Sequence, residues 1–225
     1  MNLPSETLER TSTEAGQAVY SPLVLRIYDL WVVRFSCSFV WRCPARTMLA
    51  HYERHIGDVH LDVGVGTGYF LDHVRFDAKS PEITLFDLNE NSLRATAARI
   101  ARYAPASVRG DVLEPNELPR RHYDSVGMSF LFHCLPNGGA GKWRALDHVA
   151  PTLKETGTLF GSTIVAPWPH PHQRWLAGVY NDKGIFSNRN DSAELLRSEL
   201  AKRFAEIELK QVGSVALFAA RGPVT

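Results

Sequence analysis

The sequence predicts one α/β domain built around a mostly parallel sheet, and three observations lead to this fold class. Short β-branched apolar runs alternate with stretches of helical periodicity from residue 59 to residue 165, and strands separated by helices form parallel βαβ units. A glycine-rich turn, residues 64–68, joins the first of these strands to a helix. The chain ends in two strand-like runs separated by Gly213 and Ser214, which predicts an antiparallel hairpin at the sheet edge.

The individual elements follow from the same patterns. The run from Tyr20 to Trp41 carries large apolar and aromatic residues at helical spacing and stops before Pro44, so one or two helices precede the sheet. Strands are expected at residues 59–65, 83–88, 107–109, 125–132, 158–165, 206–212 and 215–220. Helices are expected at residues 46–54, 68–74, 91–103, 140–153 and 191–204.

No shift of composition along the 225 residues suggests a second domain, so residues 1–225 are expected to fold as one unit. Within it we expect a helical cap over residues 1–55 and an α/β core over residues 56–225. The segment APWPHPHQRW, residues 166–175, holds three prolines, and we expect a stiff loop there. A substrate loop is accordingly placed near residues 166–190.

The sharpest motif is LDVGVGTGYF, residues 61–70, in which Gly64, Gly66 and Gly68 follow a strand and precede a helix. Glycine there allows a tight turn and a close approach of a ligand to the backbone. The dinucleotide fingerprint would need a further glycine at the position of Tyr69. This departure argues against a nicotinamide or flavin site.

Two aspartates follow the next two expected strands. Asp87 ends the strand in ITLFDL, about 20 residues after the glycine turn, where a carboxylate can accept hydrogen bonds from both ribose hydroxyls. Asp111 follows the third strand in VRGDVL. A plain glycine turn would explain neither aspartate, so the three features together predict a nucleoside site.

With these motifs the sequence resembles the class I S-adenosylmethionine-dependent methyltransferases, in which D/E-x-G-x-G-x-G follows the first strand. The resemblance covers residues 55–222 and implies a Rossmann-like three-layer sandwich with a seven-stranded, mostly parallel sheet whose last strand is antiparallel. It implies that Asp62 and the three glycines face the methionine part of the cofactor and Asp87 the ribose. The remaining residues that it assigns to the cofactor are Asp111 and Val112 at the adenine, Ser129, and Tyr20 with Tyr28 as a closing pair.

Within that family the chain is most similar to small-molecule enzymes of secondary metabolism. After the fourth strand, residues 129–132 read SFLF, which lacks the N/D-P-P-Y motif of DNA amino-methylases. No aspartate of the metal-dependent catechol type occurs between Ser125 and Pro136. His133 lies just past this strand and is the candidate general base, although a histidine that only packs beside the cofactor is the commoner case.

Methyl transfer requires an aligned nucleophile in a dry cavity more than it requires acid–base chemistry. Aromatic side chains on both sides of the site are therefore candidates to enclose a substrate. Those expected to bind it are Trp31, Phe35, Trp168 and Trp175, with Phe39, Trp41 and Tyr180 as further members of the cap. The alternative is that the N-terminal aromatics only pack a helix on the sheet.

Composition limits the partners. Twenty-five Lys and Arg balance 24 Asp and Glu, so nucleic acid is not expected, and the Arg94–Arg109 group is interpreted as a solvated face. Charges interrupt the apolar stretch from Leu23 to Trp41, and the chain begins with no basic leader, so we expect a cytoplasmic protein without a membrane span. A homodimer is possible. The three cysteines and the HPH sequence at residues 170–172 lack metal-site partners, so no metal is expected.

The leading hypothesis is methyl transfer from S-adenosylmethionine to an oxygen or nitrogen of a small, partly hydrophobic metabolite, with S-adenosylhomocysteine as the product. Methylation of a carbon on a quinone- or polyketide-like substrate is one alternative. A domain that binds the cofactor without catalysis is another. Methylation of arsenite by converging thiols is a remote option, because the cysteine motifs of that family are missing.

Overall fold

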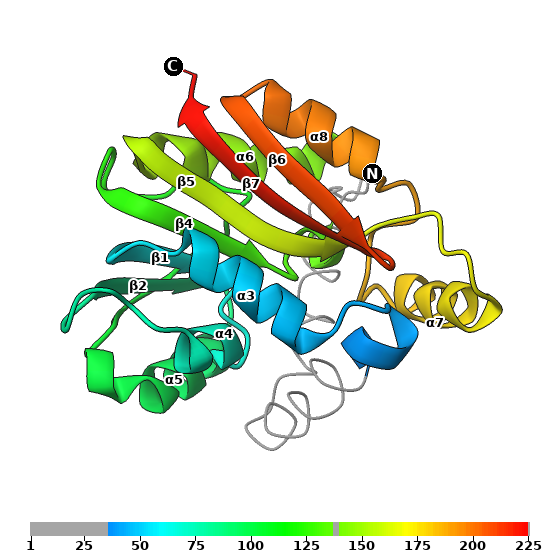
Figure 1. Ribbon diagram of the computed structural model, residues 1–225, viewed down its shortest axis with the longest axis horizontal. Helices are drawn as coiled ribbons and strands as arrows, with labels where there is room; N and C mark the ends of the chain where they lie inside the picture. The colour runs from blue at the N-terminus through cyan, green and yellow to red at the C-terminus, as the bar shows by residue number, and fades with distance from the viewer. Residues whose placement is uncertain (1–35, 137–139, 225) are drawn as a thin grey trace, which may run out of the picture.

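A computed structural model describes residues 36–136 and 140–224 and confirms the predicted fold class. Seven strands form one sheet in the order β3-β2-β1-β4-β5-β7-β6. All neighbours in β3-β2-β1-β4-β5 are parallel, and β7 is antiparallel to both β5 and β6 (Figure 1). The strands are β1 (Val59–Val63), β2 (Glu82–Asp87), β3 (Ala106–Arg109), β4 (Tyr123–Ser129), β5 (Leu153–Ile164), β6 (Phe204–Val212) and β7 (Val215–Pro223).

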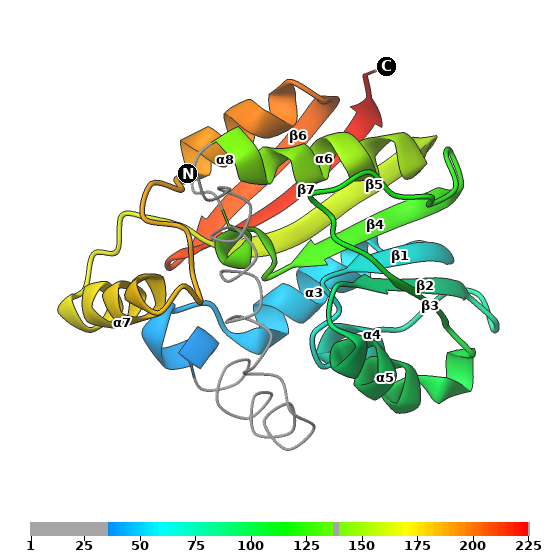
Figure 2. The same cartoon turned by 180° about the vertical axis from the view of Figure 1, so that it is seen from behind.

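Helices cover both faces of the sheet. Figure 1 shows α3 (Ala45–His55), α4 (Tyr69–His73) and α5 (Glu90–Arg99) in front, and Figure 2 shows α6 (Arg144–Val149) and α8 (Ala193–Ala201) on the opposite face. Two buried clusters match these layers, since Leu146 and Leu196 pack with Val126 whereas Leu71 and Leu93 pack with Leu85. The fold is therefore a three-layer sandwich, and its central strands are buried on both sides.

The antiparallel hairpin forms where the sequence predicts it. Val212 pairs with Val215 across Gly213 and Ser214, and Gly213 has φ +60°, a conformation that favours glycine. A Cβ at Gly213 would also lie only 2.2 Å from the backbone oxygen of Trp41. The backbone amide of Ser214 donates a hydrogen bond to that same oxygen at 2.8 Å. The hairpin thus supports the chain that leads into α3.

One segment differs from its prediction: residues 171–175 begin a helix, α7 (Pro171–Asp182), rather than continuing a stiff loop. Proline suits the first turn of a helix, where its missing N–H has no partner to lose. The Gln173 side chain accepts a hydrogen bond from the amide of His170 and donates one to the carbonyl of Val40. These contacts fix the helix start against the N-terminal part of the chain.

Smaller differences concern the ends of elements. The strand β5 starts at Leu153, inside the region expected to be helical, and β4 ends at Ser129. Short 3-10 helices occupy Ala101–Tyr103, Phe132–Cys134, Ala140–Trp143 and Ala150–Thr152. Among the helices of residues 36–136 and 140–224, none is long and apolar enough to cross a membrane.

Candidate active site

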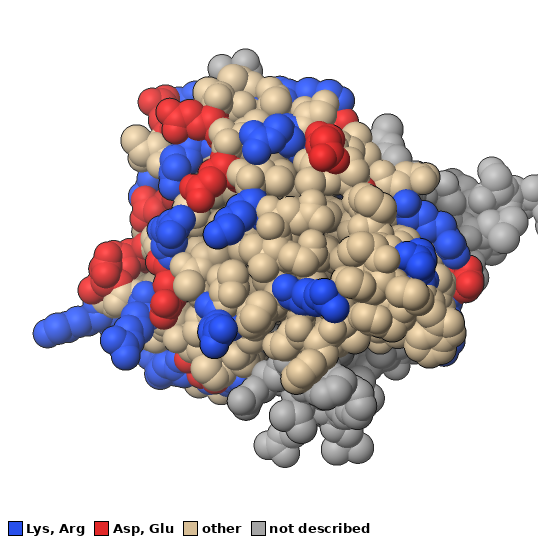
Figure 3. Space-filling view, turned by 45° about the vertical axis from the view of Figure 1, so that its right-hand side comes forward, with Lys and Arg blue, Asp and Glu red and all other residues tan. Residues whose placement is uncertain are grey.

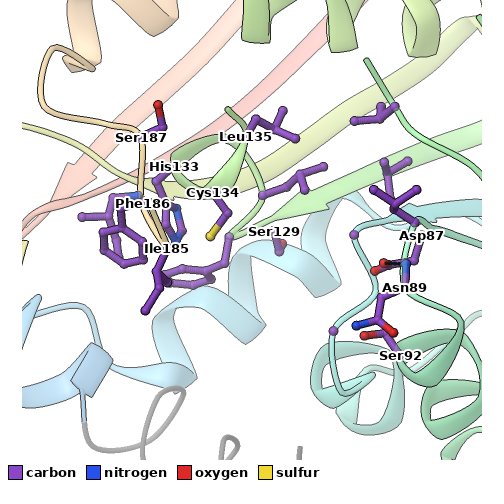
Figure 4. A pocket seen from close by; sticks show the side chains of 18 of the residues that line it. Asp87, Asn89, Ser92, Ser129, His133, Cys134, Leu135, Ile185, Phe186 and Ser187 are labelled. Carbon is purple, nitrogen blue, oxygen red and sulfur yellow. Dashed lines mark hydrogen bonds between the residues drawn. The ribbon is translucent and has the colours of Figure 1, made fainter. Parts of the chain in front are cut away.

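A cavity of about 660 Å³ opens at the carboxyl ends of β1, β2 and β4. This is the edge at which parallel α/β sheets bind their ligands. Figure 4 shows Asp87, Asn89 and Ser92 at one end of the cavity and His133, Cys134, Ile185 and Phe186 at the other, with Ser129 between them. The cavity therefore has a polar end and an apolar end.

The three glycines of the turn after β1 all have positive φ, at +74°, +53° and +71° for Gly64, Gly66 and Gly68. A Cβ at Gly64 would lie 2.8 Å from Leu131, and one at Gly68 would lie 2.7 Å from Thr96. No atom of the described residues lies within 4 Å of a Cβ at Gly66, which lines the cavity. Two of the glycines thus allow the turn to pack, and Gly66 leaves space for a ligand against the backbone.

Asp87 ends β2 and lines the polar end of the cavity. Burial raises the pKa of its carboxyl to about 6, although backbone N–H groups of Asn89, Gly66 and Val65 oppose this. The Asn89 amide donates to Asp87 Oδ1 at 2.8 Å. The side-chain nitrogen of Asn89 is itself buried and finds no acceptor among the described residues. A ligand that offers hydroxyls and an acceptor would satisfy both groups.

Four further residues assigned to the cofactor follow or end strands of the sheet. Asp111, Val112 and Ser129 line the cavity, and Asp111 Oδ1 accepts from the amide of Leu113 at 2.9 Å. Asp62 lies near the end of β1 but outside the cavity lining, with about 10% of its side chain exposed. Three of these four residues therefore line the cavity, and Asp62 does not.

The apolar end combines residues from after β4 with residues from α7 and the segment that follows it. It is lined mainly by Cys37, Trp41, Phe130, Leu131, Leu135, Ile164, Tyr180, Ile185 and Phe186. Phe130 has φ +59°, which is strained for a residue with a large side chain. Of these residues, Trp41 and Tyr180 were expected in the cap. Ile185 and Phe186 were missed, because a short apolar pair after a glycine carries no signal of its own.

His133 lies at the apolar end and is only 3% exposed. Burial, together with the charge of Lys142, lowers the pKa of its imidazole to about 3. The backbone N–H of Ile164 donates to Nδ1 at 3.3 Å, so Nε2 carries the ring proton. The imidazole is thus neutral at ordinary pH and offers a hydrogen-bond donor.

A buried ion pair holds the wall beside His133. Lys142 is fully buried, and its Nζ lies 2.7 Å from Asp191 Oδ2 and 3.3 Å from the Phe132 carbonyl. It also donates to the carbonyl of Ser187, whose amide donates to the carbonyl of His133 at 2.8 Å. Burial lowers the pKa of Lys142 and raises that of Asp191, and the pairing opposes both shifts. This pair could not be predicted from sequence patterns, since its partners are 49 residues apart.

Several predicted substrate and cofactor residues are not brought to the cavity by the described structure. Tyr20, Tyr28, Trp31 and Phe35 lie outside the described residues. Trp168 packs in the cluster around Trp41, and its indole nitrogen is buried without a partner in the described chain. Trp175 is 70% exposed on α7 and does not line the cavity.

The charged stretch of residues 94–109 pairs locally. Arg99 and Arg102 both bind the Asp72 carboxylate, at 2.9 and 2.7 Å. On the face shown in Figure 3, basic and acidic side chains lie among uncharged ones. The rings of His170 and His172 stack at 5.5 Å, and residues 36–136 and 140–224 contain no group of three or more His, Cys, Asp or Glu side chains that could hold a metal ion.

Comparison with known proteins identifies the family. A family model described as a methyltransferase domain matches residues 61–159, from β1 into β5. The demethylluteothin O-methyltransferase of Streptomyces thioluteus is 40% identical over 91% of this chain and 90% of its own length. The physcion biosynthesis cluster O-methyltransferase of Aspergillus chevalieri is 37% identical over 95% of this chain and 97% of its own.

Among solved structures, the N-methyltransferase NodS from Bradyrhizobium japonicum, determined in complex with S-adenosyl-L-homocysteine, has the same fold. Its TM-score is 0.63 with 13% identity, over 95% of this chain and 99% of that chain. The family match covers the glycine turn and both aspartates, and the similarity to the two O-methyltransferases extends over nearly the whole chain. The chain therefore belongs to the S-adenosylmethionine-dependent methyltransferases.

Proposed function

We propose that the protein transfers a methyl group from S-adenosylmethionine to an oxygen of a small, partly hydrophobic metabolite. The observation that carries this proposal is a cavity with a polar end at the glycine turn and an apolar end beyond β4. Oxygen is favoured over nitrogen because the two relatives compared above are named O-methyltransferases. The division into a cap, residues 1–55, and a core, residues 56–225, belongs to the proposal, as do a cytoplasmic location and a homodimer.

The polar end fits the cofactor in three respects. These are the open space at Gly66, the buried carboxyl of Asp87, and the side-chain nitrogen of Asn89, which has no hydrogen-bond partner among the described residues. S-adenosylmethionine supplies an activated methyl group on a sulfonium ion when it is bound. We assign Asp87 to the ribose hydroxyls, since a buried carboxylate is stabilised by donated hydrogen bonds. Asp62, the glycine turn, Asp111, Val112 and Ser129 keep the positions along the cofactor that the family resemblance implies.

The apolar end excludes water and aligns the acceptor. Aromatic side chains from both sides, Phe130 and Phe186, contact the ring of His133 edge-on at 5.4 and 4.6 Å. They leave space suited to a planar, uncharged part of a substrate. His133, predicted as a general base, has too low a pKa to hold an abstracted proton, so we assign its Nε2–H to donate a hydrogen bond to the acceptor.

The test is a methyl-transfer assay with S-adenosylmethionine and a panel of small phenols, enols, carboxylic acids and amines. We expect S-adenosylhomocysteine release and an O-methylated product with apolar phenols or enols, and none with hydrophilic, charged acceptors. The Asp87→Asn variant is the control for release that does not depend on the site. A product methylated on carbon would favour the quinone- or polyketide-type alternative. Cofactor binding without turnover of any acceptor would favour the accessory-protein alternative.

A further inference from the structure

A chain of buried hydrogen bonds ends on Asp62, and the function proposed above makes no use of it. Tyr52 of α3 is 1% exposed, and its hydroxyl lies 2.9 Å from Asp62 Oδ1 and 3.0 Å from His60 Nε2. His60 is fully buried, and its Nδ1 lies 2.8 Å from Ser125 Oγ. The amide of Gly57 donates to that same Oγ at 2.8 Å. Four residues of three elements and the amide before β1 thus form one connected series.

The carboxylate end determines the direction of the hydrogen bonds in this series when the His60 imidazole is neutral. A backbone N–H can only donate and a carboxylate can only accept. Tyr52 must therefore give its one proton to Asp62 and accept from His60 Nε2–H. His60 Nδ1 must then accept the hydroxyl proton of Ser125, whose oxygen accepts from Gly57. In the His60 tautomer that the carboxylate end requires, the series has one polarity, which ends on Asp62 Oδ1.

The surrounding packing leaves room for this series and holds it in place. A Cβ at Gly127 would lie 3.0 Å from Asp62 Oδ1, 3.1 Å from the His60 ring and 3.2 Å from the Tyr52 hydroxyl. The Tyr52 ring stacks on Phe70 at 5.4 Å and contacts Phe160 edge-on at 4.8 Å. Burial and the neighbouring Asp62 raise the pKa of the Tyr52 phenol well above its usual value, so it stays a donor.

We propose that Tyr52 and His60 are positioning residues that hold the Asp62 carboxylate for the ammonium group of the cofactor. Oδ1 is occupied by Tyr52, whereas Oδ2 has no hydrogen-bond partner among the described residues and the side chain keeps about 10% of its surface exposed. A carboxylate held in one orientation binds a cation without a further loss of side-chain freedom. This inference rests on the proposed function, because it assigns Asp62 to the cofactor.

The experiment compares two ligands that differ only at the amino-acid end. S-adenosylhomocysteine carries the ammonium group and 5′-methylthioadenosine lacks it. We expect Tyr52→Phe to weaken S-adenosylhomocysteine about 10-fold, as for loss of a hydrogen bond to a charged group, and to leave 5′-methylthioadenosine unchanged within about 2-fold. Ser125→Ala, at the far end of the series, should have a smaller effect of the same kind. Isothermal titration measures both ligands.

The matched control is Tyr123→Phe. Tyr123 is equally buried at 1% exposure but lies at the start of β4, away from Asp62. The Tyr123→Phe variant should have a lower melting temperature, as Tyr52→Phe does. Its affinities for S-adenosylhomocysteine and for 5′-methylthioadenosine should both be unchanged. This control separates loss of a buried hydroxyl from loss of the series.

Three outcomes would overturn the inference. If Asp62→Asn weakens S-adenosylhomocysteine and Tyr52→Phe does not, Tyr52 does not position Asp62, and the proposed function stands. If Tyr52→Phe weakens both ligands equally, its role is only structural. If the wild-type protein binds neither ligand, the proposed function fails together with the inference.

Discussion

The two ends of the cavity are built in different ways. The polar end is lined by residues between 63 and 112, at and after the ends of β1, β2 and β3, and its polar groups come from the glycine turn and from short side chains such as Asp87 and Asn89. The apolar end is made from large side chains of residues 130–136 and 180–187, together with residues 36–41. One end is encoded locally in short motifs and the other by packing between distant segments. We infer that the first binds the part that all such enzymes share and the second sets which substrate is methylated.

Their electrostatics differ as well. The polar end holds an acidic group, Asp87, whose pKa burial raises to about 6. The apolar end holds a neutral imidazole, His133, and a buried charge that is already paired, Lys142 with Asp191. Substitutions at the polar end should therefore alter cofactor affinity. Substitutions at the apolar end should alter the stability of the protein or the turnover of the methyl acceptor.

Lys142→Met should give the largest effect. It leaves Asp191 buried without its cation, which lowers the free energy of unfolding by about 3–5 kcal/mol. Lys154→Met is the control, since Lys154 pairs with Asp124 at 2.7 Å but both are over a third exposed, and about 1 kcal/mol or less is expected. Urea unfolding measures both variants. A Lys142→Met protein as stable as wild type would show that the ion pair does not hold this wall.

Gly66→Ala should separate the two ends most clearly. Gly66 and Gly184 both have positive φ and open space at Cβ, so an alanine at either position costs similar backbone strain, about 1 kcal/mol. Only Gly66 lies at the cofactor end. We expect Gly66→Ala to weaken S-adenosylhomocysteine at least about 100-fold, or ~2.7 kcal/mol, and Gly184→Ala to leave it unchanged. Equal losses would contradict the division of the cavity.

Asp87 should make cofactor binding depend on pH. Because its pKa is raised to about 6, the ligand-free carboxyl takes up a proton as pH falls through this value and can no longer accept both hydroxyls. Affinity for S-adenosylhomocysteine should fall about 10-fold from pH 7 to pH 5. Asp87→Asn should be at least about 10-fold weaker at pH 7, with a flat profile. The same raised pKa makes the free protein less stable as pH rises from about 4 to 6, a trend that Asp87→Asn should remove.

His133 should have the smallest effect. Its pKa of about 3 keeps it neutral from pH 5 to 9, so kcat at saturating substrates should show no histidine titration. His133→Gln, which keeps an N–H donor, should remain within about 3-fold of wild type, and His133→Phe should lose about 10-fold. A titration near pH 6.5, with a loss of about 100-fold or more in both variants, would restore the general-base assignment.

The fold and the polar end could be predicted because their signals are local. Gly64, Gly66 and Asp87 stand at fixed places relative to strands, and the carboxyl ends of parallel strands meet at one edge. The terminal hairpin was predictable for the same reason, since Gly213 sits between two strand-like runs. None of these inferences requires knowledge of a long-range contact.

The apolar end could not be predicted in this way. The start of α7 depends on Gln173 reaching the carbonyl of Val40, 133 residues away in sequence. The pKa of His133 depends on its burial and on Lys142, which no spacing rule relates to it. Trp175 was predicted to bind the substrate because it is aromatic and lies in the segment after the fifth strand, but its side chain is exposed on α7. Packing decides these positions.

The most direct test of the account is isothermal titration of the wild-type protein with S-adenosylhomocysteine, with NADH as the control ligand. We expect one site per chain with a Kd in the micromolar range for S-adenosylhomocysteine and no heat of binding with NADH. Binding of NADH, or of neither compound, would contradict the assignment of the glycine turn and Asp87 to this cofactor.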